Sequence, residues 1–451
     1  MARVLPVKAA GTLALAITLA LTAQDVWAKP RKKPARPAQK AAPVAAESAA
    51  PAAPSEDEEL STAVQFEQLK NGGVIWGVNR PGPMTAVAVV VRAGARQEDL
   101  AQSGVALAVA RWVLEPAVTG YLTRFGVTVE LEMLPGGAAF ILRGPSERMQ
   151  AAVAQFLKDL ARPNPAGLPR SRVRATLEPR RHDALRSLPD AVAGVCWTGS
   201  PFELPAWGAT DTLGMVDDRA QREFHAAWYR TRGMTLVVAG PRGGRDYGPL
   251  LAALSRAPMS RETIAPGQPG LPVHQVQRGQ LPITVAGVAM PGPQNAGGAL
   301  LVRARTAELL AEEMERGTLA GPWHTDIVWT ASNAVVFAAV HHSSATTEQA
   351  LTEEQAAQLK VLEGAIQGAT QLSDEEINAL RKREGARLSR RFASPEGAVR
   401  LLAPFATVTD RPVDLRKSVM ATPTPDVRKL LEGARGENVR LSIRRLPQTG
   451  T

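Results

Sequence analysis

The spacing of apolar and polar residues predicts alternating strands and helices from about residue 64 onward. The first apolar and alternating runs predict two strands around a turn at Gly72-Gly73. After a Pro-Gly-Pro turn, a continuous apolar run predicts a long strand over 86–92. The folded part of the chain is therefore expected to begin with a hairpin-like unit.

A run of apolar residues over 104–114, GVALAVARWVL, predicts the first helix. We expect Ser103 to be its N-cap, because a hydroxyl there can accept a backbone N–H, and Pro116 with Gly120 to mark its end. The rest of this half is expected to hold two strands around Pro135-Gly136-Gly137, three further helices and a closing strand, over 127–144, 147–163, 168–188, 217–230 and 234–240.

The second half repeats this order of elements, which is the strongest organisational pattern in the chain. A strand, a helix, a strand, two helices and a closing strand are expected over 281–293, 299–317, 332–342, 353–369, 373–392 and 439–446. Ser373 and Glu376 form an expected capping box at the start of the fifth of these elements. The repeat predicts an α+β protein with two similar α/β-sandwich domains, each an antiparallel or mixed sheet with helices packed on one face.

Length and composition indicate how many domains the chain can form. With 451 residues, of which 45% are hydrophobic and 21% charged, the chain is long enough to bury two or more cores. We place the domains at 62–257 and 273–449, with a Pro-rich linker at 258–272. An Ala/Pro/Lys-rich stretch at 29–61 has almost nothing to bury and predicts a disordered tether.

The N-terminus predicts export. Residues 1–28 combine Arg3 and Lys8 with a short apolar run and a small-residue cleavage site at Val26-Trp27-Ala28, as in a secretory signal peptide. An uncleaved anchor is the alternative, although the run is short for a membrane span. We expect a periplasmic or extracellular protein of the bacterial cell envelope, without a transmembrane domain once the signal is removed.

The net charge of +10 does not predict nucleic-acid binding, because the arginines are scattered and no stripe of basic and aromatic residues appears. Cys196 is the only cysteine, which excludes an intramolecular disulfide. We interpret it as a half-buried small hydrophobic residue rather than a nucleophile.

Two segments carry a resemblance to a known family. VVVRAGARQEDLAQSGVALAVARWVLEP and FHAAWYRTRGMTLVVAG are similar to the first strand with the metal helix, and to the closing helix with the last strand, of the insulinase, pitrilysin and mitochondrial processing peptidase family. The resemblance covers roughly residues 62–449. It implies a metallopeptidase-like half-clam built from two related domains.

The family's metal helix carries an inverted zinc motif, His-x-x-Glu-His, in which two histidines bind zinc and the glutamate is the general base. The corresponding positions here are Leu107, Ala110 and Arg111. Leucine and alanine have no lone pairs to offer and arginine is a permanent cation, so no metal or other cofactor is expected. The family's third ligand is a later glutamate, and the resemblance places Glu178 there.

Glu178 has two interpretations. It is either a helix-surface carboxylate among arginines or the partner of Arg111 in an ion pair that replaces the zinc cross-link. A relocated metal site is not expected, because His341 and His342 should point to opposite faces of a strand. The other histidines are scattered, at His182, His225, His274 and His324.

The family's substrate clamp, an arginine and a tyrosine in the second domain, is also altered. With Arg316-Gly317 as the anchor, Glu313 stands at the arginine position and Ala320 or Gly321 at the tyrosine position. Substrate clamping of the family's usual kind is therefore not expected.

Two functions remain open. The first is a catalytically inactive homologue, not itself an enzyme, that pairs with an active zinc peptidase of the same family, or with itself, in proteolysis of envelope peptides or proteins. The alternative is a scaffold module of the envelope that binds peptides or proteins without a peptidase. An active metallopeptidase with other ligands is not expected, because zinc needs convergent His, Cys or carboxylate ligands.

Overall fold

The computed structural model describes residues 63–163, 168–181, 184–209, 212, 215–254, 270, 273–279, 282–293, 296–319, 321–342, 348–421, 423–433 and 438–445. The expected signal peptide at 1–28, the tether at 29–61 and most of the linker at 258–272 lie outside these residues. Within the part of the chain that the structure describes, no helix is both long and apolar enough to span a membrane.

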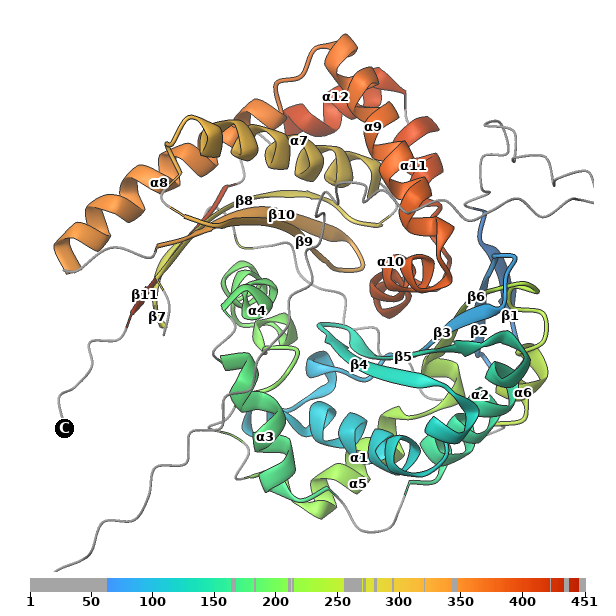
Figure 1. The fold of residues 1–451 in the computed structure, drawn as a ribbon. Helices are drawn as coiled ribbons and strands as arrows, with labels where there is room; N and C mark the ends of the chain where they lie inside the picture. Colours follow the sequence, from blue (N-terminus) through green and yellow to red (C-terminus); the bar gives the residue numbers. More distant parts are fainter. Residues whose placement is uncertain are drawn as a thin grey trace, which may run out of the picture. The chain divides into compact units, whose positions relative to one another are not determined.

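The first half forms a mixed sheet with the strand order β1-β2-β6-β3-β5-β4 (Figure 1). Its strands are β1 (Gln65–Gln68), β2 (Val74–Asn79), β3 (Met84–Val91), β4 (Thr128–Leu134), β5 (Gly137–Pro145) and β6 (Met234–Gly240). β2 and β6 run parallel, and the other neighbours run antiparallel. Every residue of β3 after Met84 is buried, which is typical of a strand covered on both faces.

The second half forms a five-stranded sheet with the order β7-β11-β8-β10-β9. Its strands are β7 (Val273–Gly279), β8 (Ile283–Pro291), β9 (Trp323–Trp329), β10 (Asn333–His341) and β11 (Asn438–Arg445). β7 and β11 are parallel and the rest are antiparallel. This matches β2-β6-β3-β5-β4 in both order and sense, so the internal repeat seen in the sequence is a repeat of topology. The domain boundaries themselves stay a prediction.

Twelve helices are found in the described residues, six from each half. Those of the first half are α1 (Val105–Gly120), α2 (Ser146–Ala161), α3 (Arg170–Arg181), α4 (Ala184–Cys196), α5 (Asp218–Trp228) and the short α6 (Gly248–Ala252). Those of the second half are α7 (Ala296–Glu315), α8 (Glu348–Ala369), α9 (Asp374–Ala393), α10 (Pro395–Val408), α11 (Leu415–Ala421) and α12 (Thr424–Gly433). The capping box of Ser373 and Glu376 at the start of α9 is confirmed.

Each sheet is covered on one face by helices of its own half and on the other by a helix of the opposite half. Val87 and Val89 of β3 belong to a cluster with α1 and α2, whereas Ala86 and Ala88 belong to a cluster with α10. Conversely, α4 packs against the second sheet and buries Cys196 in a cluster with Phe337 of β10. Both sheets belong to one compact unit, and the two halves exchange one helix each. Helices on one face were expected, and the exchange was not.

Polar contacts fix the C-terminal end of α10 beneath the first sheet. The Nε of Arg92 donates to the carbonyl oxygen of Ala406 at 2.8 Å, and the same guanidinium contacts the Thr409 carbonyl and the Asp410 carboxylate. The indole Nε1 of Trp76 donates to the Asp410 carbonyl oxygen. Arg92, which directly follows the buried strand β3, therefore joins the two halves.

Two details of the first helix differ from expectation. Its N-cap is Gly104, at φ +105°, and not Ser103, because the Glu98 carboxylate already accepts the N–H groups of the first turn. Pro116 lies inside α1, which continues to Gly120. A proline costs the helix one hydrogen bond, and the apolar burial of α1 outweighs that loss.

Candidate functional site

The first element of the candidate site is the buried start of α1. The Glu98 oxygens accept the backbone N–H groups of Gly104 at 3.0 Å and of Ala106 at 2.7 Å. Burial raises the pKa of this carboxyl to about 7, although the two hydrogen bonds act in the opposite direction. Gly208 packs so tightly that a Cβ there would lie 2.3 Å from the Gly104 Cα. The helix is thus held from its side and its end.

The residues around this start each have a structural role. Arg92 binds the end of α10, and Glu98 caps α1. Arg96 lies between these two residues in the sequence, and its guanidinium is 3.6 Å from the centre of the Phe202 ring. Burial and the nearby Arg92 lower the pKa of Arg96 to about 9. Arg92, Arg96 and Glu98 therefore support the fold.

The zinc-motif positions of α1 lie in the core. The side chains of Leu107 and Ala110 are fully buried in one cluster with Trp112, Val173 and Leu177. Arg111 is half-buried, and it makes no ion pair with a side chain that the structure describes. Two of the three positions that would face a metal are therefore filled by hydrocarbon.

The helix that would supply the third ligand still packs against α1. Glu178 lies in α3, next to the buried Leu177, and its side chain is outside the described residues. The proposed pair between Arg111 and Glu178 stays a prediction. One turn further along α1, Glu115 forms an ion pair with Arg172 of α3. The two helices are thus joined by packing and by at least one charge pair.

Histidines are engaged in other contacts. The His342 ring is fully buried between the Thr284 hydroxyl at 2.8 Å and the Glu354 carboxylate at 2.9 Å. The His225 Nε2 lies 2.9 Å from the Leu160 carbonyl oxygen. His182 and the side chain of His274 lie outside the described residues. Among the side chains described, no group of three His, Cys, Asp or Glu residues could hold a metal ion.

Cys196 ends α4 and is fully buried, deeper than the half-buried position expected. Burial raises the pKa of its thiol to about 12, so the thiolate is scarce at neutral pH. A structural role for this cysteine follows.

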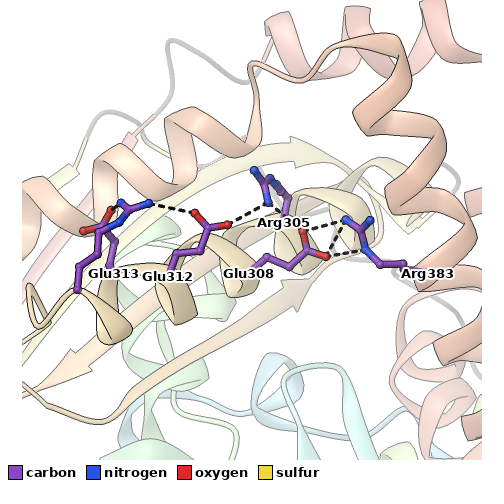
Figure 2. A network of polar contacts seen from close by, with 6 residues as sticks. Arg305, Glu308, Glu312, Glu313 and Arg383 are labelled. Atoms are coloured by element: carbon purple, nitrogen blue, oxygen red, sulfur yellow. Dashed lines mark hydrogen bonds and ion pairs between the residues drawn. The ribbon is translucent and has the colours of Figure 1, made fainter.

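Glu313, the first clamp position, is part of an exposed ion-pair network along α7 (Figure 2). Its carboxylate binds Arg316 at 2.5 Å and the Thr318 hydroxyl at 2.6 Å. Arg305, Glu308 and Glu312 continue the network along the helix, and Arg383 of α9 binds Glu308. A carboxylate thus stands where the family has a cation, and it is already paired.

Gly321, the second clamp position, has no room for a side chain. A Cβ placed there would lie 2.3 Å from the carbonyl oxygen of His341, which is backbone and cannot swing away. Ala320 lies outside the described residues. A tyrosine at position 321 would require this backbone to move.

A cavity of about 470 Å³ lies where the halves meet. It is bordered by β4 and β9, the last strands of the two sheets, and by α7, α9 and α10. Trp207, Trp329 and Phe405 supply apolar walls, and Arg303, Arg387, Arg391 and Arg400 supply charge. Its volume is within the usual range of ligand pockets. No pattern in the sequence predicted this site, and its one local sign is the i, i+4 spacing of Arg387 and Arg391 on one helix face.

Comparisons with known proteins identify the fold. No protein-family profile matches the chain, and no curated protein does. Among solved structures, it is similar to a protease from Helicobacter pylori, with a TM-score of 0.65, 15% identity and coverage of 85% of this chain and 99% of that one. It is also similar to a peptidase M16 inactive domain from Pseudomonas fluorescens, with a TM-score of 0.62, 13% identity and coverage of 86% and 100%.

A third neighbour is the periplasmic protease PqqL from Escherichia coli. The match to its first half has a TM-score of 0.56 and 15% identity, and covers 84% of this chain and 92% of that one. In the longer PqqL structure, the match covers 86% of this chain and 48% of the PqqL chain. The chain therefore has the fold of M16-like peptidases, the class to which the insulinase-like enzymes belong. At these identities the likeness establishes the fold and not the activity.

Proposed function

We propose that this chain is a catalytically inactive, exported homologue of the M16 peptidases that acts as the noncatalytic partner of an active zinc peptidase. The observation that carries the proposal is the complete burial of Leu107 and Ala110 in an apolar cluster at the position of the zinc motif. A core residue with no lone pair can neither bind zinc nor take a proton from water.

The retained architecture supports a partner role over simple decay. Both halves keep the same strand order, and the exchanged helices α4 and α10 join them. We would not expect a cavity walled by both halves to persist in a chain under no functional constraint. An inactive M16 domain among the structural neighbours provides a precedent for the fold without the chemistry.

The test is reconstitution. The full chain is co-expressed with an exported M16 homologue from the same genome that carries an intact His-x-x-Glu-His motif. We expect a stable complex, with peptide hydrolysis by the complex well above that of either chain alone. Hydrolysis by this chain alone, with stoichiometric zinc, would contradict the proposal.

The alternative, a scaffold that binds peptides without a peptidase, is favoured by one observation. β4 and β9 each pair with a single neighbouring strand among the described residues, so both border the cavity with an open edge. Saturable peptide binding by the purified chain, together with no complex and no gain in hydrolysis in the co-expression experiment, would favour the scaffold over the partner role.

A further inference from the structure

One corner of the cavity between the halves brings Arg303, Arg387 and Arg391 together around two carboxylates, Glu384 and Asp326. Arg387 of α9 is held by the buried Glu384 carboxylate, at 2.6 Å from its Nε and 2.5 Å from a terminal nitrogen. Arg303 of α7 reaches the same carboxylate only at 3.4 Å, and its Nε is buried with no hydrogen-bond acceptor among the described residues. One carboxylate therefore serves two guanidinium groups.

Arg391 adds a third cation one turn beyond Arg387. Its side chain lines the cavity and forms no hydrogen bond or ion pair with a described residue. Burial, with repulsion from Arg387, lowers the pKa of both Arg303 and Arg391, although the Glu384 and Asp326 carboxylates act in the opposite direction. The three guanidinium groups lie close enough to disfavour one another's charge, and an added anion would relieve this.

The acidic side chains of the cavity have other contacts, and the Asp326 carboxylate in addition offsets part of the charge of Arg303 and Arg391. Glu130 binds Arg400, Asp190 accepts the Ala206 N–H at 3.0 Å, and Asp326 accepts the Ile327 N–H at 2.8 Å. Glu132 also has a polar partner. The donors that remain without an acceptor among the described residues are the Nε–H of Arg303 and the guanidinium of Arg391. Because three guanidinium groups face only two carboxylates in this corner, Glu384 and Asp326, the ligand group that complements it is an anion.

The walls indicate what carries the anion. Trp329 and Phe405 pack against each other, with ring centres 4.9 Å apart, and Trp207 lies on the same cavity. A planar carboxylate matches the guanidinium fork, and aromatic rings accept apolar side chains. We infer that the cavity binds a peptide segment in which a carboxylate lies beside an apolar residue, with Arg303 and Arg391 as the carboxylate receptors. This inference rests on the proposed peptide-handling role and names the ligand class.

The test uses the full chain and three fluorescein-labelled peptides of nine residues. The first is built on Ala and Ser with a central Glu-Phe-Glu and an amidated C-terminus. The second has Gln-Phe-Gln instead, and the third has Gln-Phe-Gln with a free C-terminal carboxylate. Fluorescence anisotropy gives each Kd. We expect the first or the third peptide to bind about tenfold more tightly than the second, which identifies a side-chain or a terminal carboxylate as the ligand.

Variants connect the preference to the cavity. Arg391→Ala should remove most of the tenfold preference. Arg390→Ala should keep it, because this neighbouring arginine is exposed, as Arg391 is, but does not line the cavity. Arg303→Lys should reduce the preference less, because it keeps the charge and loses the Nε–H. Circular dichroism confirms that each variant is folded.

Equal affinity for all three peptides would overturn the inference while leaving a peptide-binding chamber in place. Absence of binding for every peptide would also overturn it, and the reconstitution experiment would then decide the proposed function separately. A preference that survives in Arg391→Ala would place the carboxylate outside this cavity and contradict the assignment.

Discussion

Helices α1 and α7 hold the same place in the two halves and have opposite surface chemistry. Each follows the central antiparallel strand of its sheet, β3 or β8. α1 is apolar on nearly every face, including at Leu107 and Ala110, whereas α7 carries Arg303 toward the cavity and an exposed ion-pair network. The same topology thus accommodates a helix buried in the core, α1, and a helix with charged side chains on its surface, α7. The position of a helix in this fold does not by itself decide where the chemistry lies.

The largest expected effect is at the core helix. Ala110→Glu restores the family's base but places a carboxylate in an apolar cluster, so unfolding free energy should fall by on the order of 4 kcal/mol. Chemical denaturation measures it. Ala151→Glu, at an exposed position of α2, is the control and should change stability by about 0.5 kcal/mol or less. Equal effects at the two positions would show that Ala110 is not core.

The cap of α1 predicts a pH dependence. Because burial holds the pKa of Glu98 at about 7, above its ordinary value of 4.5, the folded protein keeps this proton to a higher pH than the unfolded chain. The stability that this group supplies is complete below about pH 4.5 and is lost as the pH rises through 7. The loss amounts to at most about 3 kcal/mol.

Glu98→Gln tests that dependence. The variant loses one cap hydrogen bond at every pH, and its stability should decline less between pH 5 and pH 8 than that of the wild type. Denaturation curves at the two pH values measure this. An identical decline in both proteins would show that Glu98 titrates in the same range whether the chain is folded or not.

The clamp position of the second half predicts a smaller loss. Gly321→Ala places a Cβ against the His341 carbonyl oxygen and should cost about 2 kcal/mol of unfolding free energy. The matched control is Gly364→Ala in α8, where a Cβ meets nothing within 4 Å and should stabilise by about 0.5 to 1 kcal/mol. If both substitutions stabilise, the tyrosine position is more open than its geometry indicates.

The smallest expected effect is in the network of α7. Glu308 binds Arg305 and Arg383, but all three are partly exposed, so Glu308→Ala should cost less than about 1 kcal/mol (Figure 2). The loss should shrink further in 1 M salt, because the dissolved ions screen the attraction between exposed charges. A salt-independent loss of several kcal/mol would mean that this network is part of the core, as α1 is.

Much of the fold could be predicted from local patterns. The turn at Gly72-Gly73, the long strand before α1 and the capping box of α9 are encoded within a few residues each. The repeated order of elements predicted two similar halves, but it did not predict the strand order, and it missed β7 and β9. Even the Ser103 expectation failed for a local reason, since a carboxylate at Glu98 took over the capping.

The rest depends on contacts distant in sequence. α10 was not predicted, because Pro404 lies within it and because its main packing partners, β3 and β6, belong to the other half of the chain. The cavity arginines come from α7 and α9, and nothing in either segment shows that the two converge. The sequence identified which chemistry is missing at Leu107 and Ala110, whereas the charge chemistry that is present needed the structure.

The most direct test of the central claim is the zinc content and hydrolytic activity of the purified, tag-free full chain after equilibration with zinc. We predict well under one zinc ion per chain and no cleavage of a casein substrate, because the motif positions are filled by core hydrocarbon. About one zinc per chain, together with cleavage that a chelator abolishes, would contradict the account.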